Sequence, residues 1–241
     1  MPVCLLTQKK TGLRYYKVGY GECVVLLHGW GSSAKLMMPI TKGLGKYLCI
    51  VPDMYGHGLT PHPDTPLTVA CYADSVIKLL ESEKVKKATF ICHSFGGRIG
   101  IYLASHYPKI VDKLVLVDSA GLKPRRGARY YFRRFTYFLR KKLGLNTKKC
   151  GSSEYRALDG VNKKTFCNVV SYYQDEQLKD VTCPTLIVWG SRDRVTPRYM
   201  ARRLSKGIKG AKLSFIKGAG HFSYADKPKI FDKILKDFLR S

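Results

Sequence analysis

Short apolar runs recur along the chain and alternate with amphipathic segments. The runs are continuous rather than alternating, which is typical of strands buried on both faces of a parallel sheet. We expect such strands at 23–27, 48–51, 88–92, 113–117, 185–189 and 213–216. Helices are expected at 34–46, 67–83, 97–106 and 228–239. Weak alternation over 3–17 suggests an edge hairpin, and the whole pattern predicts a mostly parallel α/β sheet with helices on both faces.

Ser94 lies between the apolar run at 88–92 and the helix expected from residue 97. A serine on a tight strand-to-helix turn needs small neighbours, and Cys92-His93-Ser94-Phe95-Gly96 fits the G-x-S-x-G pattern of a nucleophile elbow. Cys92 replaces the first glycine, and we interpret it as a small buried hydrophobe at a strand end. This motif alone leaves open a glycine-rich turn without chemistry.

Two further residues complete a catalytic set in the order of the chain. Asp193 follows one later strand, and His221 follows the next. A serine hydroxyl becomes a good nucleophile when a histidine takes its proton and a carboxylate orients that histidine. Because ligands of doubly wound sheets bind outside the carboxyl ends of the strands, we expect the loops of Ser94, Asp193 and His221 to meet there.

In this order and with these motifs, the chain resembles the α/β-hydrolase superfamily over nearly its whole length. The motifs that carry the resemblance are His28-Gly29 after a strand, the elbow at Cys92-His93-Ser94-Phe95-Gly96, Asp193 in Gly-Ser-Arg-Asp-Arg-Val-Thr-Pro, and Gly220-His221. The resemblance implies the α/β-hydrolase fold in a single domain that spans 1–241, with a helical lid insertion. It also implies an oxyanion hole made by the backbone N–H groups of Trp30 and Phe95, while His28 holds its loop.

Several neighbouring residues are alternatives to this set. Asp118 also ends a strand near the elbow, and some members of the superfamily take the acid from that strand. We favour Asp193 as the acid and expect Asp118 to anchor its loop through backbone amides. His93 adjoins the nucleophile, but adjacent side chains on a tight turn point apart, which disfavours an accessory role. His57 and His62 lie in a loop without ligand spacing and are expected at the surface.

Composition is consistent with one intracellular enzyme. With 241 residues, of which 45% are apolar, the chain can bury a core as one undivided domain. No apolar run is long enough for a signal peptide or a membrane span. The eight cysteines are scattered without a C-x-x-C pair, which argues against a zinc site and for reduced thiols. We therefore expect a cytoplasmic protein and predict no metal and no other cofactor.

The net charge of +26 is concentrated in the expected lid, which extends from about 122 to 182. Between 119 and 153 the sequence contains eleven Lys or Arg residues and no acidic residue. Aromatic residues at helical spacing over 131–138 predict a packing stripe opposite several arginines. The simplest interpretation is a lid helix with solvated charges, and the alternative is docking to an acidic carrier protein or an anionic membrane surface. Nucleic acid is disfavoured because no nucleic-acid motif is present.

The function expected from these features is cleavage of a carboxylic ester by a serine hydrolase, through an acyl-enzyme. Thioesters and amides are second choices as substrates. Haloalkane dehalogenases and epoxide hydrolases of this fold use an aspartate nucleophile, so Ser94 argues against both. Two alternatives stay open: a thioesterase or carrier-protein esterase that docks an acidic partner through the lid, and a non-enzymatic ligand receptor that keeps the triad.

Overall fold

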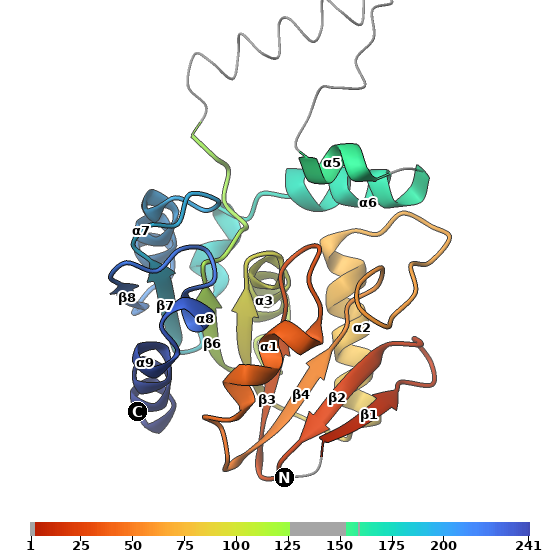
Figure 1. Ribbon diagram of the computed structural model, residues 1–241, viewed down its shortest axis with the longest axis horizontal. Helices are drawn as coiled ribbons and strands as arrows, with labels where there is room; N and C mark the ends of the chain where they lie inside the picture. Colours follow the sequence, from red (N-terminus) through yellow and green to blue (C-terminus); the bar gives the residue numbers. More distant parts are fainter. Residues whose placement is uncertain (1–2, 126–152, 159) are drawn as a thin grey trace, which may run out of the picture.

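The computed structural model describes residues 3–125, 153–158 and 160–241 (Figure 1). Its centre is an eight-stranded sheet with the strand order β1-β2-β4-β3-β5-β6-β7-β8. The strands are β1 (Val3–Thr7), β2 (Arg14–Val18), β3 (Glu22–Leu27), β4 (Tyr47–Pro52), β5 (Ala88–His93), β6 (Val111–Val117), β7 (Thr185–Gly190) and β8 (Lys212–Ile216). All six strands predicted from apolar runs and the hairpin at the N-terminal end are confirmed, with small shifts at their ends.

Strands β3 to β8 are parallel to one another, whereas β1 and β2 are antiparallel to their neighbours. The central strand β5 is buried along its whole length, as its continuous apolar run predicts. Parallel strands all end at the same edge of a sheet. The loops after β3, β5, β6, β7 and β8 therefore come together at one edge, where the predicted catalytic residues lie.

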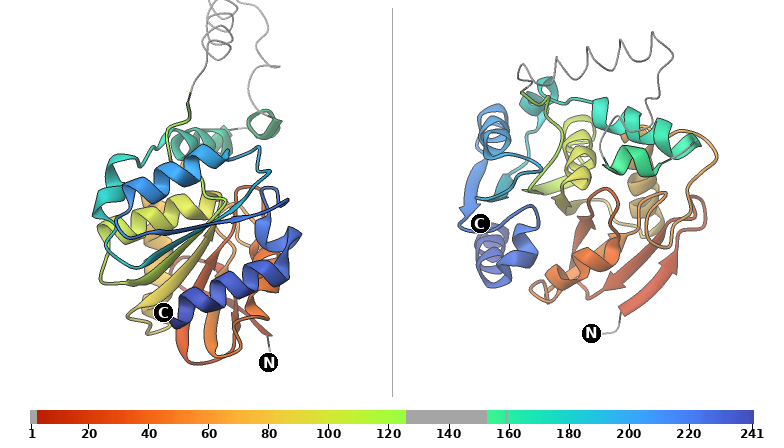
Figure 2. Two further views of the ribbon diagram at one scale, coloured as in Figure 1. Left: turned by 90° about the vertical axis from the view of Figure 1, so that its left-hand side faces the viewer. Right: turned by 45° about the horizontal axis from the view of Figure 1, so that its top comes forward.

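Helices cover both faces of this sheet (Figure 2). The helices are α1 (Ala34–Thr41), α2 (Val69–Ser82), α3 (Phe95–His106), α5 (Ser153–Ala157), α6 (Gly160–Ser171), the 3₁₀ helix η1 (Glu176–Asp180), α7 (Arg198–Gly207), α8 (Ser223–Asp226) and α9 (Pro228–Arg240). Buried residues of α1, α8 and α9 pack on one face of the sheet, and those of α2, α3 and α7 pack on the other. These two cores confirm the α/β-hydrolase arrangement of a mostly parallel sheet between two helical layers.

Helices α1 and α7 differ from the sequence-based expectation, and the four-residue helix α8 was not predicted either. Helix α1 ends at Thr41 rather than near residue 46, because the chain turns through a glycine-rich segment before β4. Helix α7 was not predicted at all. Its apolar positions are few, and Met200, Ala201 and Leu204 are the residues that it buries among arginines. Packing against the sheet therefore stabilises a helix whose apolar pattern has too few residues to be recognised in the sequence.

Within the segment from 122 to 182, the described residues form the helices α5, α6 and η1, and non-helical stretches such as 122–125 and 172–175 flank or connect them. Helices α5 and α6 lie above the carboxyl edge of the sheet (Figure 1), and η1 leads back to β7. The aromatic stripe predicted over 131–138 lies outside the described residues, as do most of the basic residues of the predicted lid. In the described ranges, no helix combines the length and the apolar character that crossing a bilayer requires.

Candidate active site

Ser94 is the single residue between strand β5 and helix α3. Its backbone has φ 49° and ψ −110°, a conformation that non-glycine residues rarely adopt. The turn also requires small neighbours. A Cβ on Gly96 would lie 2.4 Å from the Leu27 carbonyl oxygen, and a Cβ on Gly97 would lie 1.8 Å from Ser119 Oγ. These close approaches explain why two glycines follow so soon after the serine.

Cys92 replaces the first glycine of the elbow motif, and the structure shows how its larger side chain fits. The residue is fully buried, and its Sγ faces Gly100 of helix α3. A Cβ on Gly100 would lie only 2.6 Å from that sulfur. The absence of a side chain at Gly100 therefore makes room for the Cys92 thiol. Burial raises the pKa of the Cys92 thiol, which keeps it protonated at neutral pH. The prediction of a small buried hydrophobe is confirmed.

Hydrogen bonds join Ser94, His221 and Asp193, which lie on three loops at the carboxyl edge of the sheet. His221 Nε2 lies 3.0 Å from Ser94 Oγ, and His221 Nδ1 lies 2.9 Å from Asp193 Oδ2. An ionised carboxylate can only accept a hydrogen bond, so Nδ1 carries the hydrogen and Nε2 is free to accept from the serine hydroxyl. This geometry suits the transfer of the serine proton to the histidine.

Asp193 is held by its own loop, through Val195 and Thr196. Its Oδ1 accepts from the backbone N–H of Val195 at 2.8 Å and of Thr196 at 3.0 Å. Its Oδ2 accepts from the Thr196 hydroxyl at 2.6 Å. Burial alone would raise the pKa of Asp193, but the hydrogen bonds from His221 and Thr196 hold it below its usual value. The sequence pattern did not predict this role for Thr196, although threonine commonly makes such bonds in turns.

Asp118 occupies the corresponding place one strand earlier and makes different contacts. Its Oδ1 accepts from the backbone N–H of Gly190 at 2.7 Å, and its Oδ2 accepts from that of Ser223 at 3.0 Å. Complete burial, with a smaller contribution from nearby Asp193, raises the pKa of Asp118 to about 7. Asp118 therefore ties β7 to the start of α8, which agrees with the expected loop anchor.

The backbone N–H groups of Trp30 and Phe95 flank the elbow. Among the described residues, neither group donates a hydrogen bond to a protein acceptor. The loop of Trp30 lies close against the elbow: Gly96 N donates to the His28 carbonyl at 3.1 Å, and a Cβ on Gly29 would lie 3.3 Å from Ser94 Cβ. Two free donors beside the nucleophile are what an oxyanion hole requires.

The side chain of His28 holds the loop of Trp30 in place through two hydrogen bonds. Its Nε2 accepts from the backbone N–H of Met54 at 3.0 Å, and its Nδ1 lies 2.8 Å from the Gly29 carbonyl oxygen. Complete burial lowers the pKa of His28 to about 3, so the ring is neutral at physiological pH. The ring connects the loops after β3 and β4, in agreement with the structural role implied by the resemblance.

His93 contacts His221 in a way that the sequence did not predict. Its Nε2 lies 2.8 Å from the His221 carbonyl oxygen, and because a carbonyl only accepts, this nitrogen donates. Burial lowers the pKa of His93 to about 4, so the ring stays neutral. The side chain of His93 therefore holds the backbone of the loop that carries His221.

The expectation of a surface position for His57 was wrong. Its side chain is only 8% exposed, because the loop after β4 folds back over the elbow. The His57 ring meets the edge of Trp30 at 4.9 Å and stacks on Phe95 at 6.1 Å, both measured between ring centroids. His62 is half-buried. The position of His57 in a loop does not predict its contacts with Trp30 and Phe95, because both contacts depend on how the loop folds back toward the sheet.

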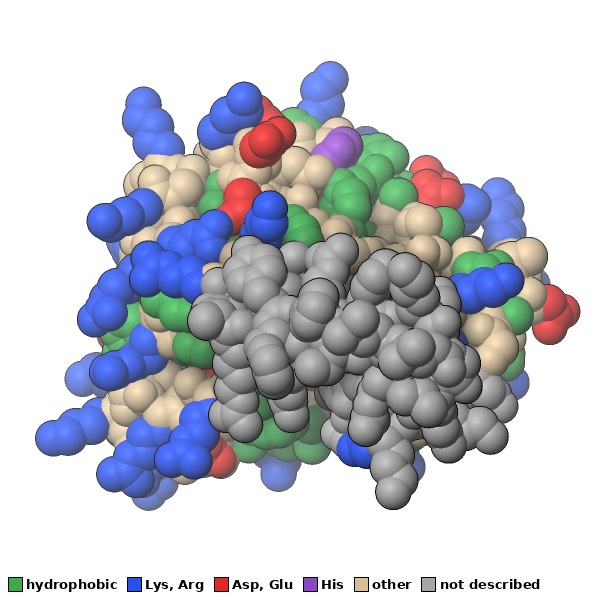
Figure 3. Space-filling model, turned by 90° about the horizontal axis from the view of Figure 1, so that it is seen from above, with side chains coloured by type: hydrophobic (Ala, Val, Ile, Leu, Met, Phe, Trp, Pro, Cys, Tyr) green, Lys and Arg blue, Asp and Glu red, His purple; other side chains and the backbone are tan. Residues whose placement is uncertain are grey.

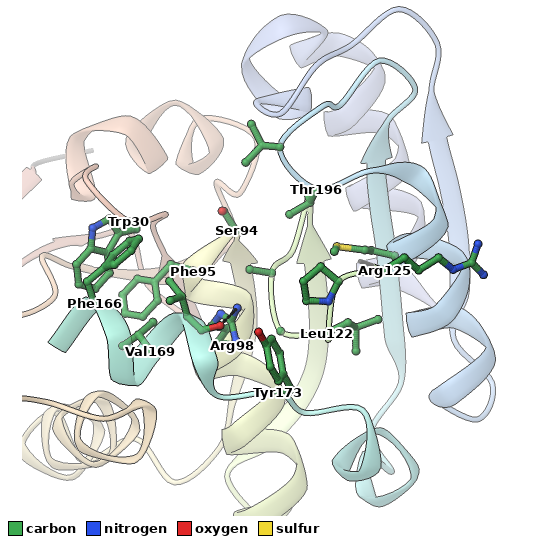
Figure 4. A pocket seen from close by; sticks show the side chains of 16 residues that line it. Trp30, Ser94, Phe95, Arg98, Leu122, Arg125, Phe166, Val169, Tyr173 and Thr196 are labelled. Atoms are coloured by element: carbon green, nitrogen blue, oxygen red, sulfur yellow. Dashed lines mark hydrogen bonds between the residues drawn. The ribbon is translucent and has the colours of Figure 1, made fainter. Parts of the chain in front are cut away.

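A cavity of about 480 Å³ opens beside Ser94 (Figure 4). The elbow and helix α3 form its floor, with Ser94, Phe95 and Arg98. Helix α6 closes one side with Phe166 and Val169, and the Phe166 ring lies 5.3 Å from that of Trp30 between centroids. Most of the lining is apolar, so the cavity suits a small organic substrate with an apolar part.

Comparison with known proteins agrees with this architecture. A model of the alpha/beta hydrolase family matches residues 24–233. The chain is 26% identical to the uncharacterized protein Rv2715 of Mycobacterium tuberculosis (92% of this chain and 76% of the relative) and 25% identical to the monoacylglycerol lipase ABHD6 of Bos taurus (92% and 77%).

A solved esterase from Exiguobacterium antarcticum has the same fold. It superposes with a TM-score of 0.77 at 22% identity, over 98% of both chains. This structural similarity shows the fold alone, whereas the family model covers most of the sequence. The protein therefore belongs to the alpha/beta hydrolase family.

Proposed function

We propose that this protein is a serine hydrolase that cleaves a carboxylic ester through an acyl-enzyme intermediate. The observation that carries the proposal is the pair of hydrogen bonds from Ser94 Oγ to His221 and from His221 to Asp193, beside an open cavity. The lipase and the esterase described above act on ester bonds by their names, which supports an ester as the substrate. Family membership supports hydrolysis in general.

In the first half-reaction, Ser94 Oγ attacks the ester carbonyl carbon while His221 Nε2 takes the hydroxyl proton. The tetrahedral oxyanion accepts hydrogen bonds from the backbone N–H groups of Trp30 and Phe95, and each such donor is usually worth about 10²–10³ in rate. His221 then gives its proton to the alcohol oxygen as the C–O bond breaks. Asp193 keeps Nδ1 protonated and stabilises the imidazolium throughout.

In the second half-reaction, water takes the place of the departed alcohol. His221 Nε2 accepts a proton from the water, whose oxygen attacks the acyl carbon, and the same two N–H groups hold the second oxyanion. Collapse of this intermediate returns the proton to Ser94 Oγ and releases the carboxylic acid. The strained turn at Ser94 keeps the hydroxyl aligned with His221 and the two donors through both steps.

The test is labelling with a fluorophosphonate, which reacts quickly only with an activated serine. The wild-type protein should be labelled and should hydrolyse short methyl esters, and Ser94→Ala should abolish both. The thermal midpoint of Ser94→Ala should stay near wild type, because the hydroxyl makes no packing contact that the fold needs. Ser205→Ala, on helix α7, is the control and should behave like wild type. A folded wild-type protein that is neither labelled nor active would favour the ligand-receptor alternative, and turnover by Ser94→Ala would remove the proposal.

We also propose that residues 1–241 form one domain, in which the segment from about 122 to 182 is the lid. Helix α6 supports this role because Phe166, Val169 and Val170 line the cavity beside Ser94. The backbone N–H of Leu67, just before α2, donates to Thr165 Oγ1 at 3.0 Å, which joins α6 to the start of α2. Lid residues therefore contribute to the shape of the substrate site.

An anionic membrane surface is the partner that we propose for the basic side of the molecule. Lys and Arg side chains gather on the side formed by α7 and β8 (Figure 3). Residues 194–217 contain eight Lys or Arg and no acidic residue, and seven of these cations are exposed. Binding to vesicles with anionic lipid should weaken steeply as salt rises. Binding that is insensitive to salt would contradict this, and preference for an acidic carrier protein over vesicles would support the carrier-esterase alternative.

A further inference from the structure

Arg98 is a buried cation in the wall of the substrate cavity. It is 7% exposed and lies on helix α3, four residues after Ser94. Ser94 directly precedes α3, so Arg98 lies about one helical turn into the helix that follows the nucleophile. Both side chains line the cavity, and Figure 4 shows the Tyr173 hydroxyl turned toward the Arg98 guanidinium. A positive charge is therefore fixed a short distance from the nucleophile.

Among the described residues, the groups beside the Arg98 guanidinium are neutral: two backbone carbonyls and the Tyr173 hydroxyl. The guanidinium donates to the backbone carbonyls of Tyr172 and, at 3.3 Å, of Val170, at the carboxyl end of α6. These carbonyls accept two of the five N–H donors of a guanidinium and offer only partial negative charge. No ion pair between described residues includes Arg98. Burial lowers the pKa of Arg98 to about 10, so it remains cationic at neutral pH.

The cavity as a whole is positive. Of its lining residues, only Arg98 and Arg125 are charged, and none is acidic. Arg125 lies at the rim, where its guanidinium covers the Tyr199 ring at 4.9 Å. Charges act more strongly in a largely apolar cavity than at the surface, so the cavity favours an anionic ligand.

We propose that Arg98 binds a carboxylate of the substrate, and that the preferred substrate is the half-ester of a short dicarboxylic acid. This inference rests on the proposed ester hydrolysis. The acyl part is the portion that becomes bonded to Ser94, whereas the alcohol leaves in the first half-reaction, and Arg98 lines the same cavity as Ser94. A short spacer between the ester carbonyl and the free carboxylate suits a cavity of about 480 Å³ that both residues line, and glutarate, with about three methylene groups, represents this length.

The first test compares two esters of nearly equal size, monomethyl glutarate and methyl pentanoate, by methanol release. The charged ester should have the higher kcat/KM in the wild-type protein by about 10- to 100-fold, as expected for a charge-assisted hydrogen bond to a buried guanidinium. Arg98→Gln should remove this preference or reverse it. Arg202→Gln, an exposed change of the same kind on α7, should leave the preference near the wild-type value.

The second test needs neither turnover nor a variant, and so it applies even if Arg98→Gln does not fold. Free glutarate should slow fluorophosphonate labelling of wild-type Ser94 at concentrations at least about tenfold below those needed for pentanoate. Equal protection by the two acids would overturn the inference. So would a wild-type preference for methyl pentanoate, although active labelling and hydrolysis would leave the proposed function intact. A preference for 4-acetoxybutanoate over monomethyl glutarate would overturn the placement of the carboxylate on the acyl side.

Discussion

Two carboxylates end neighbouring strands of the sheet, and they have different surroundings. Asp193, after β7, accepts from His221 Nδ1 and has a lowered pKa. Asp118, after β6, accepts from the backbone N–H groups of Gly190 and Ser223 and has a raised pKa. The two residues have the same chemical group and similar burial. Their different roles follow from which atoms of the segment after β8 reach them: the ring of His221 reaches Asp193, whereas the backbone N–H of Ser223 reaches Asp118.

The difference also shows how local hydrogen bonds set the charge of a buried acid. Asp193 receives the Thr196 hydroxyl and two backbone N–H groups in addition to His221, and these donors outweigh its burial. Asp118 accepts hydrogen bonds from two backbone N–H groups, but its burial raises its pKa by more than these hydrogen bonds lower it. A carboxylate that must stabilise an imidazolium has to remain ionised, so the surroundings of Asp193 suit the proposed role and those of Asp118 do not.

The largest effect is expected from Asp193→Asn. An amide in this place can hold His221 in the wrong tautomer and cannot stabilise its positive charge, so kcat for ester hydrolysis should fall by about 10³- to 10⁴-fold. Steady-state kinetics on methyl pentanoate, together with the thermal midpoint, would measure the change. A loss of less than tenfold would show that the acid lies elsewhere and would return Asp118 to consideration.

Asp118→Asn should have a smaller effect on kcat, below about tenfold, and should act mainly on stability. The folded-state pKa of about 7 is above the ordinary value of 3.8, so the protonated form is favoured in the folded protein. This group therefore stabilises the wild-type fold fully below about pH 4, and its contribution is lost as the pH rises toward 7, by about 1.4 kcal/mol per pH unit.

Denaturant unfolding of wild type and Asp118→Asn over pH 4 to 8 would measure this contribution. At pH 4 the variant should be less stable by about 1–3 kcal/mol, because an amide N–H then faces a backbone N–H. The deficit should shrink as the pH rises. The lowered pKa of Asp193 predicts the opposite slope, with stability lost as the pH falls below about 4. A deficit in Asp118→Asn that grows with pH would contradict the assignment.

The smallest effect is expected from Thr196→Val, which removes the hydroxyl that donates to Asp193 Oδ2 but keeps the size of the side chain. The two backbone donors and His221 remain, so kcat should fall by about tenfold or less. Thr185→Val removes another buried threonine hydroxyl, at the start of β7, and is the matched control. A loss as large as that of Asp193→Asn would show that Thr196 itself takes part in the chemistry.

The sequence determined the fold class and the identity of the candidate nucleophile. Continuous apolar runs predicted the parallel strands because buried strands need apolar residues on both faces. Gly96 and Gly97 after Ser94 marked the elbow because the turn leaves no room for side chains there. Both signals are local, so they can be read from neighbouring residues. Helix α7 carried no such signal, because its few apolar residues can be recognised as a buried face only once the helix is seen packed against the sheet.

Tertiary structure alone decided which acid reaches His221, and how Arg98, His57 and His93 are used. Each of these depends on segments far apart in the chain: Asp193 and His221 are 28 residues apart, and His93 contacts the backbone of His221 across 128 residues. Sequence spacing gives a loop its place at the edge of the sheet but not the direction in which it turns. That direction is set by packing and by backbone hydrogen bonds between loops, such as those that bind Asp118 to β7 and α8.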